Sequence, residues 1–409
     1  MGEPTLSDSA QRMAELCREH RAHFAACYGA GPAPRVFFAP GRVNLFGGHL
    51  DYNGGPVMPT AIDRGTLIAL RPRRDRRLRL ASTLDPDGLE LALDSPPLTR
   101  RGRWVDYPLG VVQDLLESAR ERGHLARLEG CDVLFGGNLP VGAGLSSSAS
   151  ICVGSAFAFD HLWGLELGTE GRVASALRAE RGFVGVQCGI MDPYAVGLAR
   201  PGHILWLDCK DVTWRHLPLD FASVSIGVAN SGVRRELAAV AFNERVAQCA
   251  EAFRRLAPHA PGASCLRDVT REALDAHKGE LPAMLLRRAE HVVGEVQRTF
   301  EARAAVLAGD LARMGTLMTE THGSLREQYE VSCPELDLLV EAAVGSNGVF
   351  GSRLTGAGFG GCTVMLVAKG SEDAVRDEVQ ERFRAVHGRT PEVDFFAGDE
   401  GPRELEEGA

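Results

Sequence analysis

The stretch from Cys131 to Gly164 constrains the fold more than any other part of the sequence. It reads CDVLFGGNLPVGAGLSSSASICVGSAFAFDHLWG: a short apolar run, a loop of glycine and serine, and a long apolar segment. The first run predicts a strand, and the last segment predicts a helix that is hydrophobic on nearly all sides. Such a helix has to be buried in a core. We therefore expect a strand–loop–helix unit whose Gly/Ser loop opens a buried helix.

This Gly/Ser loop has the chemistry of a phosphate site. A helix N-terminus offers free N–H groups and the positive end of the helix dipole, and a serine hydroxyl there can coordinate phosphate-bound Mg²⁺. The loop is not a Walker A motif, because no lysine precedes Lys210, and it does not match G-x-G-x-x-G. The simpler alternative is that glycine and serine only cap the helix. The phosphate-binding candidates are Gly142, Ala143, Gly144, Leu145, Ser146, Ser147 and Ser148.

A second loop, GRVNLFGGHLDYNGG from Gly41 to Gly55, follows an earlier apolar run. It gathers Arg42, Asn44, His49 and Asp51 among glycines. Polar groups on a loop between strands suit a hydroxyl-rich ligand, whereas the alternative is an ordinary Asn-Gly turn at the surface.

The order of segments predicts two α+β domains, over residues 1–215 and 216–409. After about residue 215 a buried strand, long helices and a strand–glycine loop–strand unit follow in turn. We expect the glycine loops to face a shared cleft, a common location for ligand sites. The acidic, glycine-containing end, residues 398–409, is predicted to be disordered.

Charge and hydropathy exclude several classes of protein. The net charge of -9 argues against a nucleic-acid partner, because phosphate contacts need clustered positive charge. No apolar run is long enough for a transmembrane helix, and the first residues lack the pattern of a signal peptide. We therefore expect a cytoplasmic protein with no membrane partner. Its 10 cysteines show no metal-ligand spacing. The sequence leaves the oligomeric state open between monomer and dimer.

Four motifs in sequence order resemble the galactokinase branch of the GHMP small-molecule kinases. They are GRVNLFGGHLDYNGG, LPVGAGLSSSAS, CGIMDPY and LTGAGFGGCTV, and the resemblance runs from about Ala39 to Val364. It implies a ribosomal-S5-like N-terminal domain and a ferredoxin-like C-terminal domain, with ATP and a sugar in the cleft between them. It also implies an ATP-dependent kinase that phosphorylates the anomeric C1 hydroxyl of a galactose-type sugar.

The resemblance assigns roles to particular residues. Asp192 would be the catalytic base and Arg42 the cation between that base and the γ-phosphate; such a cation favours an ionised carboxylate and stabilises charge on the transferring group. Glu180 and Ser148 would bind Mg²⁺. The expected sugar-binding residues are Arg42, Gly48, His49, Asp51, Gly189, Asp192 and Phe242. Besides the Gly/Ser loop, the expected ATP-binding residues are Trp104, Gly356 and Gly358.

Three positions depart from the galactokinase pattern. Gly48 stands where the family has a glutamate that reaches the sugar's C6 hydroxyl, Phe242 stands for a tyrosine, and Pro193 stands for a glutamine. Each lost hydrogen bond would weaken binding by on the order of 1 kcal/mol.

Alternative functions therefore stay open. A galacturonokinase has to admit a C6 carboxylate that a glutamate would repel, and an arabinokinase acts on a pentose without C6. A non-catalytic sugar and ATP sensor would lack a Ser-Ala pair in the serine loop, but Ser148 and Ala149 are present. The sugar loop and the CGIMD motif disfavour a GHMP kinase for a non-sugar substrate.

Overall fold

The N-terminal half is built on a mixed β-sheet. The computed structural model describes residues 6–94, 98–125, 128–140, 144–186, 188–233 and 238–406. The strands run in the order β13-β1-β3-β6-β4-β5, and only β4 and β6 pair in parallel within this order. Their bounds are β1 Arg35–Asn44, β3 Pro59–Arg73, β4 Arg77–Ser82, β5 Asp85–Ala92, β6 Gly130–Gly137 and β13 Arg403–Leu405.

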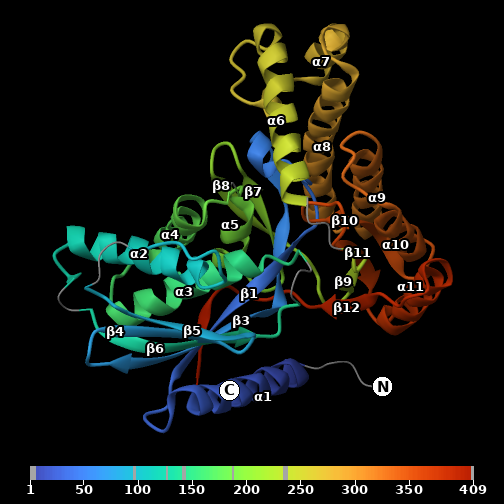
Figure 1. Cartoon of the computed structure of the whole chain (residues 1–409). Coiled ribbons are helices and arrows are strands. Elements are labelled where there is room, and N and C mark those ends of the chain that lie inside the picture. Colours follow the sequence, from blue (N-terminus) through green and yellow to red (C-terminus); the bar gives the residue numbers. More distant parts are fainter. Residues whose placement is uncertain are drawn as a thin grey trace.

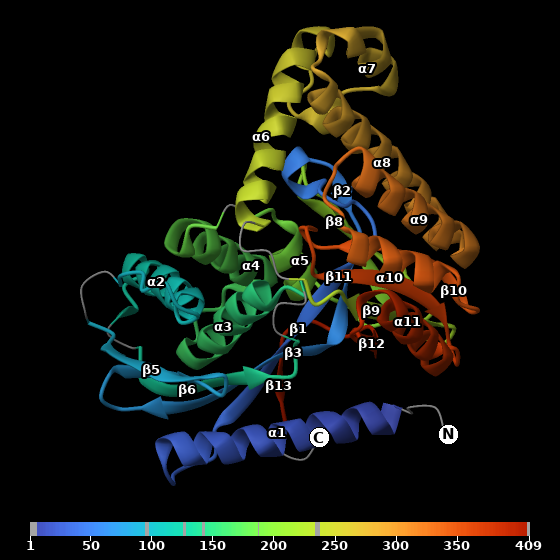
Figure 2. The same cartoon turned by 45° about the vertical axis from the view of Figure 1, so that its right-hand side comes forward.

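Helices cover both faces of this sheet. Helix α1 lies across one face, and α2 to α5 lie on the other (Figures 1 and 2). Helix α3 packs directly on β1 and β3, and its alanines, Cys152, Val153 and Phe159 are buried. This confirms the buried helix predicted from its apolar sequence. The bounds are α1 Leu6–Tyr28, α2 Asp106–Glu121, α3 Ser147–Trp163, α4 Gly168–Arg178 and α5 Met191–Gly197, with a π-helical turn η3 over Ala179–Val184.

The C-terminal half contains an antiparallel sheet in the order β10-β11-β9-β12. Helices α10 and α11 pack against each other and cover this sheet, and α9 packs on β10. The long helices α6 and α8 project away from both sheets and carry α7 at their tip (Figure 1). The strands are β9 Val224–Asn230, β10 Val349–Thr355, β11 Cys362–Ala368 and β12 Glu392–Phe396. The helices are α6 Ala238–Leu256, α7 Arg271–His277, α8 Ala283–Ala308, α9 Leu311–Glu327, α10 Pro334–Val344 and α11 Glu372–His387.

A small sheet in the order β2-β7-β8 pairs a short strand from between β1 and β3 with two strands that directly precede the C-terminal half. Its strands are β2 Pro56–Val57, β7 His203–Asp208 and β8 Thr213–Pro218. The boundary expected at residue 215 falls inside β8. The described residues also form short helical turns: η1 Asp51–Asn53, η4 Ala257–His259, η5 Leu266–Asp268 and η6 Lys278–Glu280. Helices mixed with largely antiparallel sheets confirm the α+β class.

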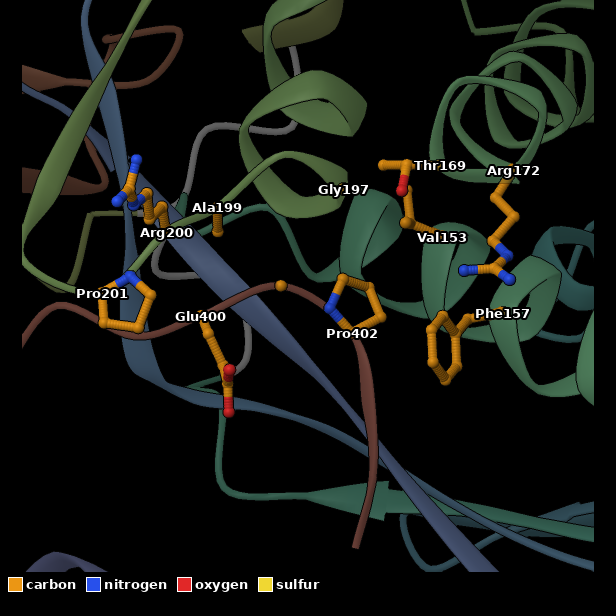
Figure 3. A pocket seen from close by; sticks show the side chains of 11 residues that line it. Val153, Phe157, Thr169, Arg172, Gly197, Ala199, Arg200, Pro201, Glu400 and Pro402 are labelled. Carbon is orange, nitrogen blue, oxygen red and sulfur yellow. The ribbon is translucent and has the colours of Figure 1, made fainter. Parts of the chain in front are cut away.

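The predicted disorder of the C-terminal end is wrong for residues 398–406. The Gly401 N–H donates to the Ala199 carbonyl at 3.2 Å. Glu400 and Pro402 line a small cavity of about 190 Å³ against α3, α4 and the end of α5 (Figure 3). The chain then enters β13, which pairs antiparallel with β1. The last strand of the C-terminal half therefore completes the N-terminal sheet, a contact that local composition does not reveal.

None of the described helices combines the length and the apolar composition that crossing a lipid bilayer requires.

Candidate active site

A cavity of about 510 Å³ opens where the loop after β1, the start of α3, η3, α5, α6 and the loop after β10 meet. It brings together residues from all four sequence motifs. The predicted site residues on its wall are Arg42, Gly48, His49, Asp51, Ser148, Glu180, Gly189, Asp192, Phe242 and Gly356. The wall also includes Asn44, which the sequence analysis named among the polar groups of the second loop, and Tyr52, Cys188 and Arg353, to which it assigned no role.

Arg42 and Asp192 form a bidentate ion pair on this wall. Arg42 Nε donates to Asp192 Oδ1 at 2.7 Å, and Nη2 donates to Oδ2 at 2.5 Å. The third guanidinium nitrogen, Nη1, donates to the Gly144 carbonyl at 2.8 Å. The Ser146 hydroxyl also hydrogen-bonds Asp192. Bidentate pairing fixes geometry as well as charge, so the carboxylate is held in one orientation.

The backbone explains why these groups meet. Ser146 precedes α3 in the left-handed conformation, with φ 61°, which turns the chain between the glycine loop and the helix. Asp192 lies in the first turn of α5, where the helix dipole favours negative charge. Pro193 follows in that same turn. A proline is accepted there because the N–H groups of a first turn have no partner within the helix.

Glu180 and Ser148 meet on the same wall. The Ser148 hydroxyl hydrogen-bonds the Glu180 carboxylate, and burial, with a contribution from the charge of Asp192, raises the pKa of Glu180 to about 7. A carboxylate and a hydroxyl are oxygen donors of the kind Mg²⁺ prefers. The two residues therefore fit a magnesium ion.

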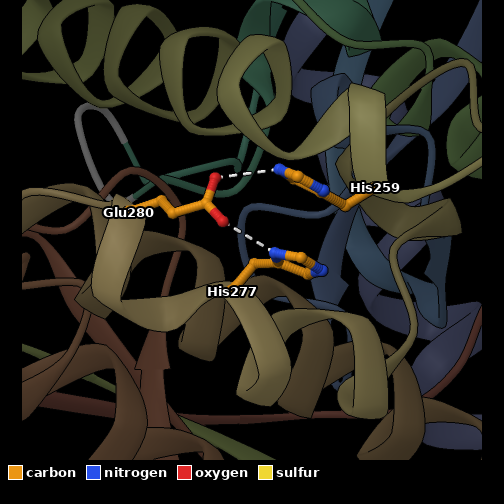
Figure 4. A group of neighbouring side chains, drawn as sticks. All are labelled: His259, His277 and Glu280. Carbon is orange, nitrogen blue, oxygen red and sulfur yellow. Dashed lines mark hydrogen bonds and ion pairs between the residues drawn. The ribbon is translucent and has the colours of Figure 1, made fainter.

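Another group of residues of metal-binding types lies near α7, at the tip of the projecting helices α6 and α8 (Figure 1). His259 Nε2 and His277 Nδ1 contact the two Glu280 oxygens at 2.8 and 2.7 Å (Figure 4). Imidazole nitrogen suits transition metals rather than Mg²⁺. This group does not line the cavity, and we give it no part in the site.

The Asp51 carboxyl group lies against the backbone of Gly189. A Cβ atom at Gly189 would lie 1.6 Å from Asp51 Oδ2, so only glycine leaves room for this carboxyl. Burial raises the pKa of Asp51 to about 6, and repulsion from Asp192 contributes. The two carboxyl groups therefore face one cavity from different elements.

An aromatic cluster closes the sugar-loop side of the cavity. The Tyr52 hydroxyl contacts His49 Nδ1 and the Tyr329 hydroxyl, both at 2.7 Å. Phe242 packs edge-on against Tyr52, with ring centroids 5.2 Å apart. Burial lowers the pKa of His49 to about 3, with the charge of nearby Arg353 contributing, so its imidazole is neutral at pH 7.

A second cavity of about 490 Å³ lies on the other side of the α3 N-terminus. Trp104, Ser147 and Ser148 line it, and Trp104 packs edge-on against Phe135 with centroids 5.6 Å apart. Ser148 lines both cavities. The start of α3 therefore separates two adjoining spaces.

The other predicted nucleotide residues differ in their positions. Gly142 and Ala143 lie outside the described residues. The Leu145 side chain is a core residue with 2% exposure, although its carbonyl accepts the Arg42 N–H at 3.1 Å. A Cβ atom at Gly358 would lie 2.3 Å from the Val331 carbonyl. Leu145 and Gly358 line neither of these two cavities, and their contact with the nucleotide stays a prediction.

Arg353 is the main residue that the sequence analysis missed. It lies in β10 with 1% exposure, beside Gly48 on the cavity wall. The signal that could have found it is a charged residue within the otherwise apolar run RLTGAGFGGCTVMLV, because a buried charge needs a partner.

Comparisons with known proteins agree with this geometry. Residues 22–72 match the galactokinase galactose-binding signature, 106–200 the GHMP kinase N-terminal domain and 302–385 the GHMP kinase C-terminal domain. The chain is 44% identical to a galactokinase of Roseiflexus, over 94% of this chain and 96% of that protein. It is 38% identical to that of Bacillus subtilis, over 93% and 97%.

Solved structures show the same similarity. The crystal structure of Lactococcus lactis galactokinase complexed with galactose matches with a TM-score of 0.88 and 32% identity, over 95% of this chain and 100% of that one. The mevalonate kinase of Methanococcus jannaschii matches with a TM-score of 0.63 at 19% identity, over 90% and 100%, which is a similarity of fold.

Proposed function

The chain belongs to the galactokinase family of the GHMP kinases, and from this premise we propose that it uses ATP to phosphorylate galactose at C1. The products are galactose 1-phosphate and ADP. The observation that carries the proposal is the bidentate pair of Arg42 and Asp192 on the wall of a cavity that adjoins the start of α3.

Asp192 acts as the general base in this proposal. Its carboxylate takes the proton of the C1 hydroxyl as the sugar oxygen bonds to the γ-phosphorus and the bond from that phosphorus to the departing ADP breaks. Arg42 orients Asp192 and places positive charge where the phosphoryl group passes. Phosphoryl transfer depends mainly on positioning and charge neutralisation, which these two residues provide without a covalent intermediate.

Ser148 and Glu180 would hold Mg²⁺, since their oxygens lie together on the cavity wall. When bound, the ion would neutralise phosphate charge during transfer. The raised pKa of Glu180 means that the free carboxylate is poorly stabilised near neutral pH. A cation would supply the missing stabilisation.

The remaining predicted residues divide between the two substrates. The sugar would contact His49, Asp51 and the rim formed by Gly48, Gly189 and Phe242, which share the cavity with Asp192. The adenine would enter the second cavity beside Trp104, and Ser147, Gly144 and Gly356 would border the phosphates. We also propose that the chain divides near residue 215 into two domains, with β13 returning to the first.

The test is an ATP-consumption assay with galactose, followed by ³¹P NMR of the product. The proposal predicts galactose-dependent ADP formation and a sugar phosphate whose phosphorus couples to the anomeric proton. No ADP formation with galactose, or a phosphate on another carbon, would contradict it.

A further inference from the structure

Gly48 leaves a space in the sugar cavity that ends at a buried guanidinium group. A Cβ atom at Gly48 would lie 3.4 Å from Arg353 Nη1 and 3.5 Å from Nη2. Gly48 and Arg353 both line the cavity that contains Asp192. A ligand oxygen in this space, a few tenths of an ångström closer, would be at hydrogen-bonding distance from Arg353.

Arg353 is incompletely satisfied. Its Nε donates to the Leu354 carbonyl at 3.0 Å, but the buried Nη1 has no hydrogen-bond partner. The carboxylate of Glu295 lies 3.8 Å from Nη1. That is too far for a hydrogen bond. A buried donor without an acceptor is unfavourable, so Arg353 has capacity for a further partner.

Glu295 is already occupied by other donors. Its Oε1 accepts the Gly47 and Gly48 N–H groups at 3.1 and 3.2 Å. Its Oε2 accepts from Arg298 at 2.8 Å and from Thr321 at 2.9 Å. One carboxylate therefore faces two arginines and two backbone donors.

Next to Gly48, the guanidinium groups of Arg298 and Arg353 thus share a single carboxylate. His291 contacts the Gly48 carbonyl through Nε2 at 3.1 Å. Burial lowers the pKa of His291 and of His49 to about 3, so both are neutral at pH 7. Burial also lowers the pKa of Arg353 to about 10, and Arg298 contributes to this decrease. The guanidinium would still be charged at pH 7, and an anion beside it would be stabilising.

We propose that Arg353 and Gly48 form an anion subsite at the C6 end of the sugar cavity, so that the enzyme also phosphorylates galactose-type sugars oxidised to a carboxylate at C6. This proposal rests on the proposed C1 kinase activity. A C6 carboxylate would give Arg353 both an acceptor and a counter-charge. A C6 hydroxyl gives only an acceptor, and a pentose gives neither. Hydrogen bonds between charged groups are the stronger kind.

The test compares kcat/KM for galactose, galacturonate and arabinose in three proteins: wild type, Gly48→Glu and Arg353→Gln. The wild type should turn over galacturonate with kcat/KM at least equal to that for arabinose. Arg353→Gln should lower kcat/KM for galacturonate about 10- to 100-fold more than for galactose, as expected for loss of a charged hydrogen bond.

Gly48→Glu supplies a protein carboxylate to the same space. Through charge repulsion it should lower the ratio of kcat/KM for galacturonate to kcat/KM for galactose by a similar factor. Gly279→Glu is the matched control, because it adds the same charge at an exposed glycine with open space around it. The control should leave the galacturonate-to-galactose ratio unchanged.

Two results would overturn the subsite. One is a wild type that phosphorylates galactose but neither binds galacturonate in calorimetry nor turns it over. The other is an Arg353→Gln variant that loses both sugars equally together with a Gly48→Glu variant whose sugar ratio is unchanged, which would make Arg353 a purely structural residue. If the wild type phosphorylates no sugar at C1, the proposed function itself fails.

Discussion

At the scale of single residues, the carboxyl groups of the site differ in how they are stabilised by their surroundings. Asp192 is bound by Arg42 and Ser146, whereas burial raises the pKa values of Asp51 and Glu180. Carboxyl groups whose pKa is raised by burial destabilise the folded protein once they ionise, and a bound ligand or metal ion can offset that cost. Asp51 and Glu180 therefore make separate, testable contributions.

Replacing Asp51 with asparagine should change how stability depends on pH. The pKa of Asp51 is about 6 in the folded protein, above its ordinary value of 3.8, so the folded state binds the proton more tightly. The cost of ionising it grows as the pH rises from about 4 to about 6 and is constant above that. Asp51→Asn should therefore gain stability relative to wild type over that interval, by about 2–3 kcal/mol at pH 7. Urea unfolding between pH 4 and pH 7 measures this; a difference that does not vary with pH would contradict it.

Replacing Glu180 with glutamine should raise the Mg²⁺ concentration that gives the half-maximal rate. A neutral amide oxygen is a weaker ligand for Mg²⁺ than a carboxylate, and the variant keeps nearly the same shape. The measurement is a Mg²⁺ titration of the initial rate at saturating ATP and sugar. An unchanged titration curve would remove Glu180 from the metal site.

The sequence motifs predict residues on the cavity wall well, but not every motif residue reaches it. Arg42, Asp192, Ser148 and Glu180 lie together on the wall of one cavity, and their roles stay predictions. The Leu145 side chain is in the core, so any contact of this residue with the nucleotide would be made by its backbone, a distinction that a motif does not make.

At the scale of elements, α3 was predictable and β13 was not. The apolar composition of α3 is a local property that requires burial. Strand β13 has a charged, polar sequence, and its stability comes from pairing with β1 and from the Arg35–Glu404 ion pair, with N–O distances of 2.7 Å. These contacts join residues far apart in the sequence, so composition alone predicted disorder.

The close packing of α9 on β10 predicts that the contact position Gly315 does not tolerate a larger side chain. A Cβ atom at Gly315 would lie 1.9 Å from the Phe350 carbonyl oxygen, so Gly315→Ala would have to push the helix off the strand. We expect a loss of about 1–3 kcal/mol in the free energy of unfolding. Gly323→Ala is the control on the same helix, since nothing lies within 4 Å of its Cβ position; it should stabilise the helix by up to about 1 kcal/mol. Equal effects of the two substitutions in urea unfolding would contradict the packing argument.

At the scale of the whole molecule, the C-terminal segment ties the two halves together. It leaves β12, passes the end of α5 and pairs with β1. Arg403 also lies over the Phe38 ring, 4.8 Å from its centroid. A division into two consecutive domains therefore follows the order of the sequence but not every contact, because the last strand belongs to the first sheet.

Deleting residues 403–409 should lower the melting temperature while leaving the cavity residues in place. The deletion removes the β13 hydrogen bonds, the Arg35–Glu404 pair and the contact on Phe38. None of the deleted residues in the described part of the chain lines the cavity of Asp192, so kcat well below the melting temperature should be close to that of the full chain. A melting temperature identical to that of the full chain would show that the segment contributes nothing to stability.

The most direct test of the whole account is the rate of galactose phosphorylation by Asp192→Asn. Asparagine keeps the shape of the side chain but cannot accept the proton of the C1 hydroxyl. A positioned general base supplies about 10²–10⁴-fold in rate, so kcat should fall by at least about 100-fold, with ATP binding and the melting curve close to wild type. A purified variant that keeps more than about a tenth of the wild-type kcat would contradict the assignment of Asp192 as the base.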